Sequence, residues 1–123
     1  LGRKLLCRVR DVMQHKLPVA HLEDTFTTCL SVMNEGRMGV AIVMQNDELQ
    51  GIITDGDIRR TLAKFGAESL NKTAEDIMTR NPKTINENTF LAHAEAFMKE
   101  KHIHSLIVVT DAGKVSGIVE FAS

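Results

Sequence analysis

A hydroxyl and a carboxylate lie three residues apart where one apolar stretch ends, at Thr54 and Asp57. The apolar stretch predicts a short strand, Gly56 predicts a tight turn, and a helix is expected from about Asp57. The first turn of a helix has unpaired N–H groups and a partial positive charge, so a phosphate can bind there while Thr54 donates a hydrogen bond to it. The Asp57 carboxylate can accept from the two hydroxyls of a ribose. The pair therefore predicts a nucleotide site without a glycine-rich phosphate loop.

The same residues have a structural interpretation, in which Asp57 only caps its own helix. Residue type and position alone leave this alternative open. Arg59 and Arg60 follow in the first turns, where a positive charge opposes the helix macrodipole. One of them, for which we choose Arg60, could reach a second phosphate or the carboxylate of an acidic sugar. The alternative is a solvated helix face.

These residues belong to a chain that repeats itself after about 65 residues. Arg10-Asp11-Val12-Met13 is echoed by Glu75-Asp76-Ile77-Met78, and Gly51-Ile52-Ile53 is echoed by Gly117-Ile118-Val119. Three further matches lie between these in the same order. The repeat predicts two related subdomains, residues 1–66 with an N-terminal lead-in and residues 73–123, joined by a short polar linker at 67–72.

Each copy predicts the element order β, α, β, β, α, with the closing helix missing from the second copy. The first long helix is expected to begin at Asp24 or Thr25 and its counterpart near Asn88 or Thr89. Polar turns predict hairpins over 40–54 and 106–119, and Gly66 is expected to end a helix over 57–65. Continuously apolar strands are usually buried on both faces, and one copy alone would bury little surface. The predicted fold is therefore mixed α+β, with two β-α-β-β-α repeats packed sheet to sheet.

Composition excludes several classes of protein. The chain has 123 residues, 43% hydrophobic and 25% charged, with a formal net charge of -1, so neither nucleic acid nor a membrane is expected as a partner. Two isolated cysteines predict neither a zinc site nor a disulfide framework and favour a cytoplasmic setting, with Cys29 as a small buried apolar side chain. His102 and His104 without a third ligand do not predict a metal site. No segment pairs a nucleophile with a base, so the chain is not expected to be an enzyme by itself.

Gly51, Thr54 and Asp57 form a Gly-x-x-Thr-x-x-Asp pattern that resembles the signature of CBS domains, as do the tandem plan and the Asp-Val-Met and Asp-Ile-Met openings. The opening, residues 1–13, and the segment Thr54-Asp55-Gly56-Asp57-Ile58-Arg59-Arg60 further resemble the C-terminal half of the arabinose-5-phosphate isomerase family. That resemblance covers the whole chain. It implies a regulatory module whose parent interconverts D-arabinose 5-phosphate and D-ribulose 5-phosphate for Kdo biosynthesis, with catalysis in an absent N-terminal sugar-isomerase domain.

The resemblance also implies a ligand and a set of contacts. No cofactor is required, and an adenosine nucleotide such as AMP or ATP, or a CMP-sugar such as CMP-Kdo, would bind in a cleft between the repeats. Thr54 and Asp57 would face residues of the other copy, namely Thr84, Ile85, His104 and Ser105. Glu120 and Ser123 replace the hydroxyl and carboxylate of the second copy, and glutamate there would repel phosphate, so one site per chain is expected.

Two expectations remain. CBS pairs often associate, so a homo-dimer or higher homo-oligomer is expected, and a ligand-free structural dimerisation module is the alternative function. The chain opens Leu1-Gly2-Arg3-Lys4 without an initiator Met, which predicts an excised or processed chain.

Overall fold

The computed structural model describes residues 6–121, and these form two compact units. Unit 1 combines residues 6–17 with residues 83–121. Unit 2 is continuous, Pro18–Pro82. The predicted mixed α+β class is confirmed, because each unit contains one sheet with helices packed on it. Of the sequence features discussed above, Leu1 to Lys4 and Ser123 lie outside the described residues.

Unit 2 contains a four-stranded sheet in the order β1-β2-β3-β4. Its strands are β1 (Val19–His21), β2 (Val40–Gln45), β3 (Glu48–Thr54) and β4 (Thr79–Arg80). β1 runs parallel to β2, while β2 and β3 form the predicted antiparallel hairpin. Its turn residues Asn46 and Asp47 have φ of 51° and 63°, a left-handed conformation that Asn and Asp tolerate.

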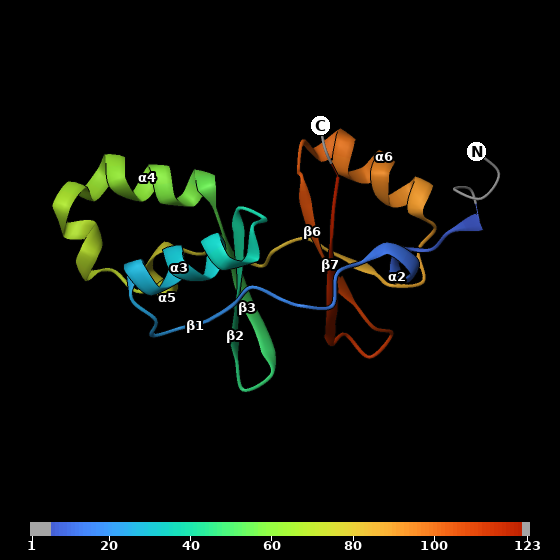
Figure 1. The fold of residues 1–123 in the computed structure, drawn as a ribbon, viewed down its shortest axis with the longest axis horizontal. Helices are drawn as coiled ribbons and strands as arrows, with labels where there is room; N and C mark the ends of the chain where they lie inside the picture. Colours follow the sequence, from blue (N-terminus) through green and yellow to red (C-terminus); the bar gives the residue numbers. More distant parts are fainter. Residues whose placement is uncertain (1–5, 122–123) are drawn as a thin grey trace. The chain divides into compact units, whose positions relative to one another are not determined.

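The helices of unit 2 are α3 (Phe26–Gly36), α4 (Asp55–Phe65), a 3-10 helix (Gly66–Asn71) and α5 (Ala74–Ile77). α3, α4 and α5 lie on the same side of the sheet (Figure 1). Apolar residues from these helices and from the strands form one buried cluster, which includes Phe26, Cys29, Met33, Ile53 and Ile58. The methionines of this cluster are core residues, in line with the adaptable packing of the thioether.

Unit 1 contains a three-stranded sheet in the order β5-β6-β7. Its elements are β5 (Thr84–Asn86), β6 (Ser105–Val109), β7 (Val115–Glu120) and the helices α2 (Val9–Val12) and α6 (Leu91–Lys101). β5 runs parallel to β6, and β6 is antiparallel to β7. Its buried cluster contains Val9, Ala94, Met98, Leu106, Val108 and Val119.

The compact units do not coincide with the sequence repeats 1–66 and 73–123, because each repeat places its lead-in helix in the other unit. α2 lies at the start of the first repeat but packs in unit 1, whereas α5 lies at the start of the second repeat but packs in unit 2. Each lead-in ends in a methionine that lies across a strand glycine. A Cβ on Gly117 would lie 2.6 Å from Met13 Sδ, and one on Gly51 would lie 2.7 Å from Met78 Sδ. The methionine of the repeated Asp-x-Met pattern is thus explained by lead-in packing.

Several local expectations are corrected. The predicted linker 67–72 is largely the 3-10 helix. Its Ser69 is buried, and the Ser69 hydroxyl donates a hydrogen bond to the Thr61 carbonyl at 3.2 Å. α6 has Phe90 at its N-cap with no side-chain cap bond, in place of Asn88 or Thr89. α4 begins at Asp55, two residues before the expected start.

Other local expectations are confirmed. Thr25 caps α3 through its side chain, which accepts from the Thr28 N–H, so it is the N-cap rather than Asp24. Gly66 is the C-cap of α4 with φ of 54°. β4 was not predicted, since two exposed residues leave no apolar pattern in the sequence.

Candidate functional site

The junction between β3 and α4 is the point where the sequence predicts a ligand site. Thr54 is the N-cap of α4 and has an extended backbone. Its hydroxyl accepts from the Asp57 N–H at 3.3 Å, and the Asp57 carboxylate accepts from the Thr54 N–H at 2.9 Å. This reciprocal pair is a capping box, with Asp in the position that Glu or Gln usually occupies. The capping interpretation of Asp57 is therefore correct for this structure.

Asp57 has further partners beyond the capping box. Its Oδ2 also accepts from the Thr54 hydroxyl at 3.2 Å. Its Oδ1 accepts from Arg60 Nη2 at 2.6 Å and from the Thr79 hydroxyl at 2.9 Å. The residue is only 5% exposed, whereas the Arg60 side chain is 71% exposed. Two oxygens offer about four acceptor sites, and four donors fill them.

Thr79 is the member of this site that the sequence did not predict. It lies 22 residues after Asp57 and reaches it because β4 pairs with β3, with Thr79 opposite Ile52. A hydroxyl directly after the Asp-Ile-Met pattern is the only sequence signal, and it has no meaning until the pairing is known.

A second chain of hydrogen bonds supports α4 behind the junction. The buried Thr61 hydroxyl donates to the Asp57 carbonyl at 2.7 Å, and the buried Ser69 hydroxyl donates to the Thr61 carbonyl. The 3-10 helix thereby fixes the first turns of α4. Rigid support of this kind keeps a binding group in one geometry.

Four predicted contact residues lie in unit 1, near one end of its sheet. Thr84 and Ile85 open β5, Ser105 opens the parallel strand β6, and His104 directly precedes it. The His104 carbonyl accepts from the Phe121 N–H at 3.0 Å. The structure thus places these four toward the same end of the β5–β6 pair, and it brings Thr54, Asp57 and Arg60 into hydrogen-bond contact within unit 2. That both groups contact one ligand stays a prediction.

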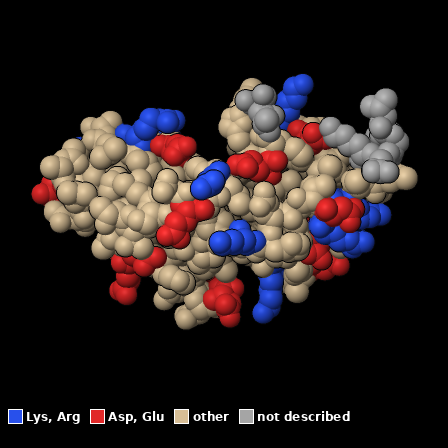
Figure 2. All heavy atoms as spheres, in the orientation of Figure 1, with Lys and Arg blue, Asp and Glu red and all other residues tan. Residues whose placement is uncertain are grey.

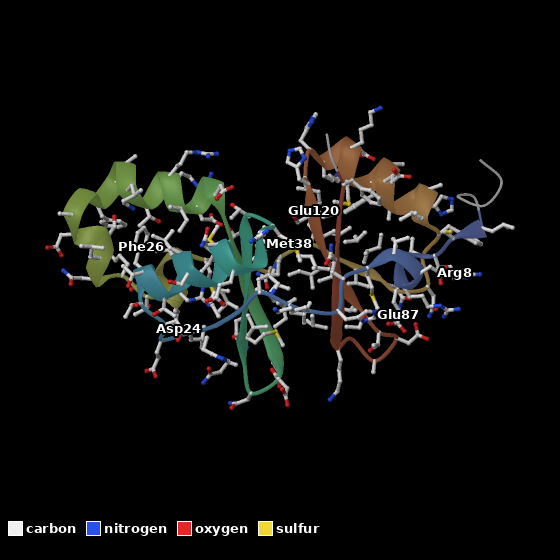
Figure 3. All side chains as sticks on the ribbon, in the orientation of Figure 1. Arg8, Asp24, Phe26, Met38, Glu87 and Glu120 are labelled. Atoms are coloured by element: carbon white, nitrogen blue, oxygen red, sulfur yellow. The ribbon has the colours of Figure 1, made fainter. Side chains whose placement is uncertain are left out.

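The corresponding junction of unit 1 differs in chemistry. Glu120, at the end of β7 (Figure 3), occupies the position of Thr54 and pairs directly with Ser105 across the sheet. Directly opposed side chains share a face of the sheet, so an anion near Ser105 would meet this carboxylate. Ser123, the counterpart of Asp57, lies outside the described residues.

Charged and reactive groups also occur away from the β3–α4 junction. On the face shown in Figure 2, acidic and basic side chains are interspersed. Among residues 6–121, no group of three metal-ligating side chains comes together, and no helix is long and apolar enough to cross a membrane. Cys29 is fully buried, as predicted, and burial together with the charge of Asp24 raises the pKa of its thiol to about 11. A neutral thiol of this kind is a poor nucleophile.

A family comparison and a search of curated proteins agree on the class of domain. The CBS domain model matches residues 9–64 and 74–121. The chain is 62% identical over 123 residues to a "Probable arabinose 5-phosphate isomerase" of Haemophilus influenzae, with 100% of this chain and 36% of that protein covered. It is 42% identical over 120 residues to arabinose 5-phosphate isomerase KpsF of Escherichia coli O6:H1, covering 97% of this chain and 36% of the relative. The chain thus spans about a third of the length of the curated relatives it matches.

Solved structures with the same fold include ligand complexes. The CBS domain pair of protein MJ0100, in complex with 5'-methylthioadenosine and S-adenosyl-L-methionine, has a TM-score of 0.79 and 29% identity over 93% of this chain and 92% of that one. CBSX2 in complex with AMP has a TM-score of 0.78 and 25% identity over 92% and 89%. An uncharacterised conserved protein from Pyrococcus horikoshii has a TM-score of 0.83 and 27% identity over 94% and 87%.

Proposed function

We propose that this chain, which belongs to the CBS domain family, is the regulatory ligand-binding module of an arabinose 5-phosphate isomerase. The observation that carries the proposal is the Thr54–Asp57 pair, a buried carboxylate and a hydroxyl held at the N-terminus of α4 in the Gly-x-x-Thr-x-x-Asp pattern. Their types match the polar groups of a ribose phosphate, and the first turn of α4 favours an anion.

The class of ligand we propose is a nucleotide with an intact ribose. Two CBS neighbours were solved with adenosine compounds, and the adenine and the ribose are the parts that S-adenosyl-L-methionine, 5'-methylthioadenosine and AMP share. In our proposal Asp57 accepts from the ribose hydroxyls, and Thr54 with the first-turn amides of α4 holds the phosphate. A CMP-sugar such as CMP-Kdo carries the same ribose and phosphate and is the second ligand we propose.

Four residues of unit 1 complete the proposed contacts. Ser105 and His104 offer a hydroxyl and an imidazole to sugar or phosphate, while Thr84 and Ile85 offer strand backbone to the base. Because Glu120 pairs with Ser105, the contact made by Ser105 is expected to be with a neutral hydroxyl rather than with phosphate.

The catalytic part of the protein is proposed to lie outside this chain. The curated relatives are about three times as long, and their names describe an isomerase. We therefore propose that an N-terminal sugar-isomerase domain carries the reaction and that the assembled enzyme is a homo-oligomer in the cytoplasm. Ligand binding regulates that domain only if its two states bind the ligand with different affinity.

One alternative has a specific observation behind it. Asp57 has no free acceptor site in this structure, and unit 2 exposes several large apolar side chains on α4 and the 3-10 helix: Leu62 at 48%, Phe65 at 36% and Leu70 at 61%. A structural dimerisation module that binds no ligand would have both features.

Calorimetric titration of the chain with AMP, ATP, CMP and CMP-Kdo separates the two functions. The regulatory proposal predicts saturable heat with at least one nucleotide and its loss in Asp57→Asn. The matched control is Asp55→Asn, which removes the same charge from the same helix turn and is expected to keep binding. No heat with any of the four ligands from folded protein would contradict the proposal and favour the dimerisation module.

A further inference from the structure

We propose that a ligand displaces Arg60 from Asp57 when it binds, and that this ion pair selects ligands carrying a phosphate. The Arg60–Asp57 ion pair is called the latch below. This inference rests on the proposed function, because it concerns the same site. Its basis is the set of donors that fill the Asp57 carboxylate and the difference in exposure and side-chain length among them.

Three of the four donors to Asp57 come from groups close to the backbone. The Thr54 N–H and hydroxyl belong to the cap of α4, and the Thr79 hydroxyl is held by the pairing of β4 with β3. The Thr54 N–H can leave Asp57 only if the backbone moves, whereas the two hydroxyls can turn about their own side-chain bonds. Arg60 differs, since its contact comes from the end of a long side chain that is 71% exposed. Its departure requires only rotamer changes.

Arg60 has the longer and more exposed of the two donor side chains on Oδ1, so a ribose hydroxyl that binds this oxygen takes the place of its guanidinium. In this structure the guanidinium donates to that oxygen at 2.6 Å, and it neutralises a carboxylate on a residue that is 5% exposed. A neutral nucleoside would displace this cation and offer it no anion in return. The latch thus lowers the affinity for neutral ligands.

A nucleotide offers the displaced guanidinium a new partner. The Arg60 side chain already lies over the first turn of α4, because a Cβ on Gly56 would lie 3.1 Å from Arg60 Nη1 and 3.5 Å from Thr54 Oγ1. A phosphate at the first-turn amides would be within reach of the same guanidinium, and Arg–phosphate contacts are strong and directional. The exchange of carboxylate for phosphate keeps the charge of Arg60 paired throughout.

The test compares nucleosides with nucleotides. Adenosine, AMP, cytidine and CMP are titrated calorimetrically into the wild type, into Arg60→Gln and into the control Arg59→Gln. Arg59 precedes Arg60 in α4 and is exposed. Removal of an exposed ion pair of this kind is expected to change the ligand affinity by about two- to fivefold. Arg60→Gln is therefore expected to bind the nucleoside about threefold more tightly and the matching nucleotide at least threefold more weakly. Arg59→Gln should change neither by more than about twofold.

The outcomes separate the two proposals. Binding by all three proteins with an unchanged ratio of nucleotide to nucleoside affinity would overturn the latch and leave the ligand site intact. An equal loss of both affinities in Arg60→Gln would also overturn the latch, because it would show Arg60 only as a support for Asp57. If none of the four ligands binds to any of the three proteins, while far-UV circular dichroism shows them folded, the proposed nucleotide site fails and the latch with it.

Discussion

Replacement of Asp57 by Ala is expected to destabilise unit 2 even in the absence of ligand. The substitution removes the acceptor for the Thr54 N–H, for the Thr79 hydroxyl and for Arg60. Half of a capping interaction is worth about 1 kcal/mol, and a buried bond to a charged group is worth about 1.5 kcal/mol or more. The Arg60 pair contributes less, because the arginine is mostly exposed. We therefore expect a loss of about 3 kcal/mol.

Urea unfolding followed by far-UV circular dichroism measures this loss, since the chain has no Trp or Tyr for fluorescence. Asp55→Ala is the matched control: Asp55 lies in the same first turn but is exposed. It should cost only the charge–dipole contribution, about 0.3 to 1 kcal/mol. If Asp57→Ala costs no more than Asp55→Ala, the four-bond description of Asp57 is refuted. Asp57→Asn keeps one oxygen acceptor, so it is the milder variant for binding experiments.

The other predictions concern stability at separate places in unit 2. Gly51→Ala should cost about 1 to 3 kcal/mol in urea unfolding, because its Cβ would lie 2.7 Å from both Met78 Sδ and the Thr79 carbonyl oxygen; an unchanged midpoint would contradict the lead-in packing. The pKa of the Cys29 thiol is raised from 9.0 to about 11 in the folded chain. Its contribution to stability is therefore present below pH 9 and lost as the pH rises toward 11. Cys29→Ala should flatten that decline in stability. The Asp76 carboxyl has its pKa lowered from 3.8, first by the hydrogen bond from the Thr73 backbone, so its contribution is present above pH 3.8 and lost as pH falls further; an Asp76→Asn variant with the same acid profile as wild type would disprove this.

The local elements could be predicted from the sequence because their signals are local. Apolar runs around an Asn46-Asp47 turn identify the β2–β3 hairpin, and Gly66 marks the end of α4. Thr54 and Asp57 were found because cap chemistry and nucleotide chemistry use the same residue types at the same spacing. For that reason the sequence could not decide between the two roles, and the structure shows the hydrogen bonds of the capping role.

The features that escaped prediction depend on contacts distant in sequence. The partnership of Thr79 with Asp57 requires the pairing of β4 with β3, which two exposed residues do not reveal. The exchange of lead-in helices between repeats is also non-local. The sequence does repeat the residues that make the contact, since Met78 echoes Met13 and Gly117 echoes Gly51. The periodicity identified the repeat but not which copy each lead-in joins.

The most direct test of the central claim is the mapping of AMP binding on the chain by NMR. In a titration of isotopically labelled protein, the ligand-binding proposal predicts saturable shifts of the backbone amides of Thr54, Asp55 and Gly56. The turn at Asp111 to Gly113, at the far end of the β6–β7 hairpin from Ser105, should stay unchanged. Absence of shifts at Thr54 to Gly56 at saturating AMP, or shifts confined to other segments, would contradict the assignment of this junction as the ligand site.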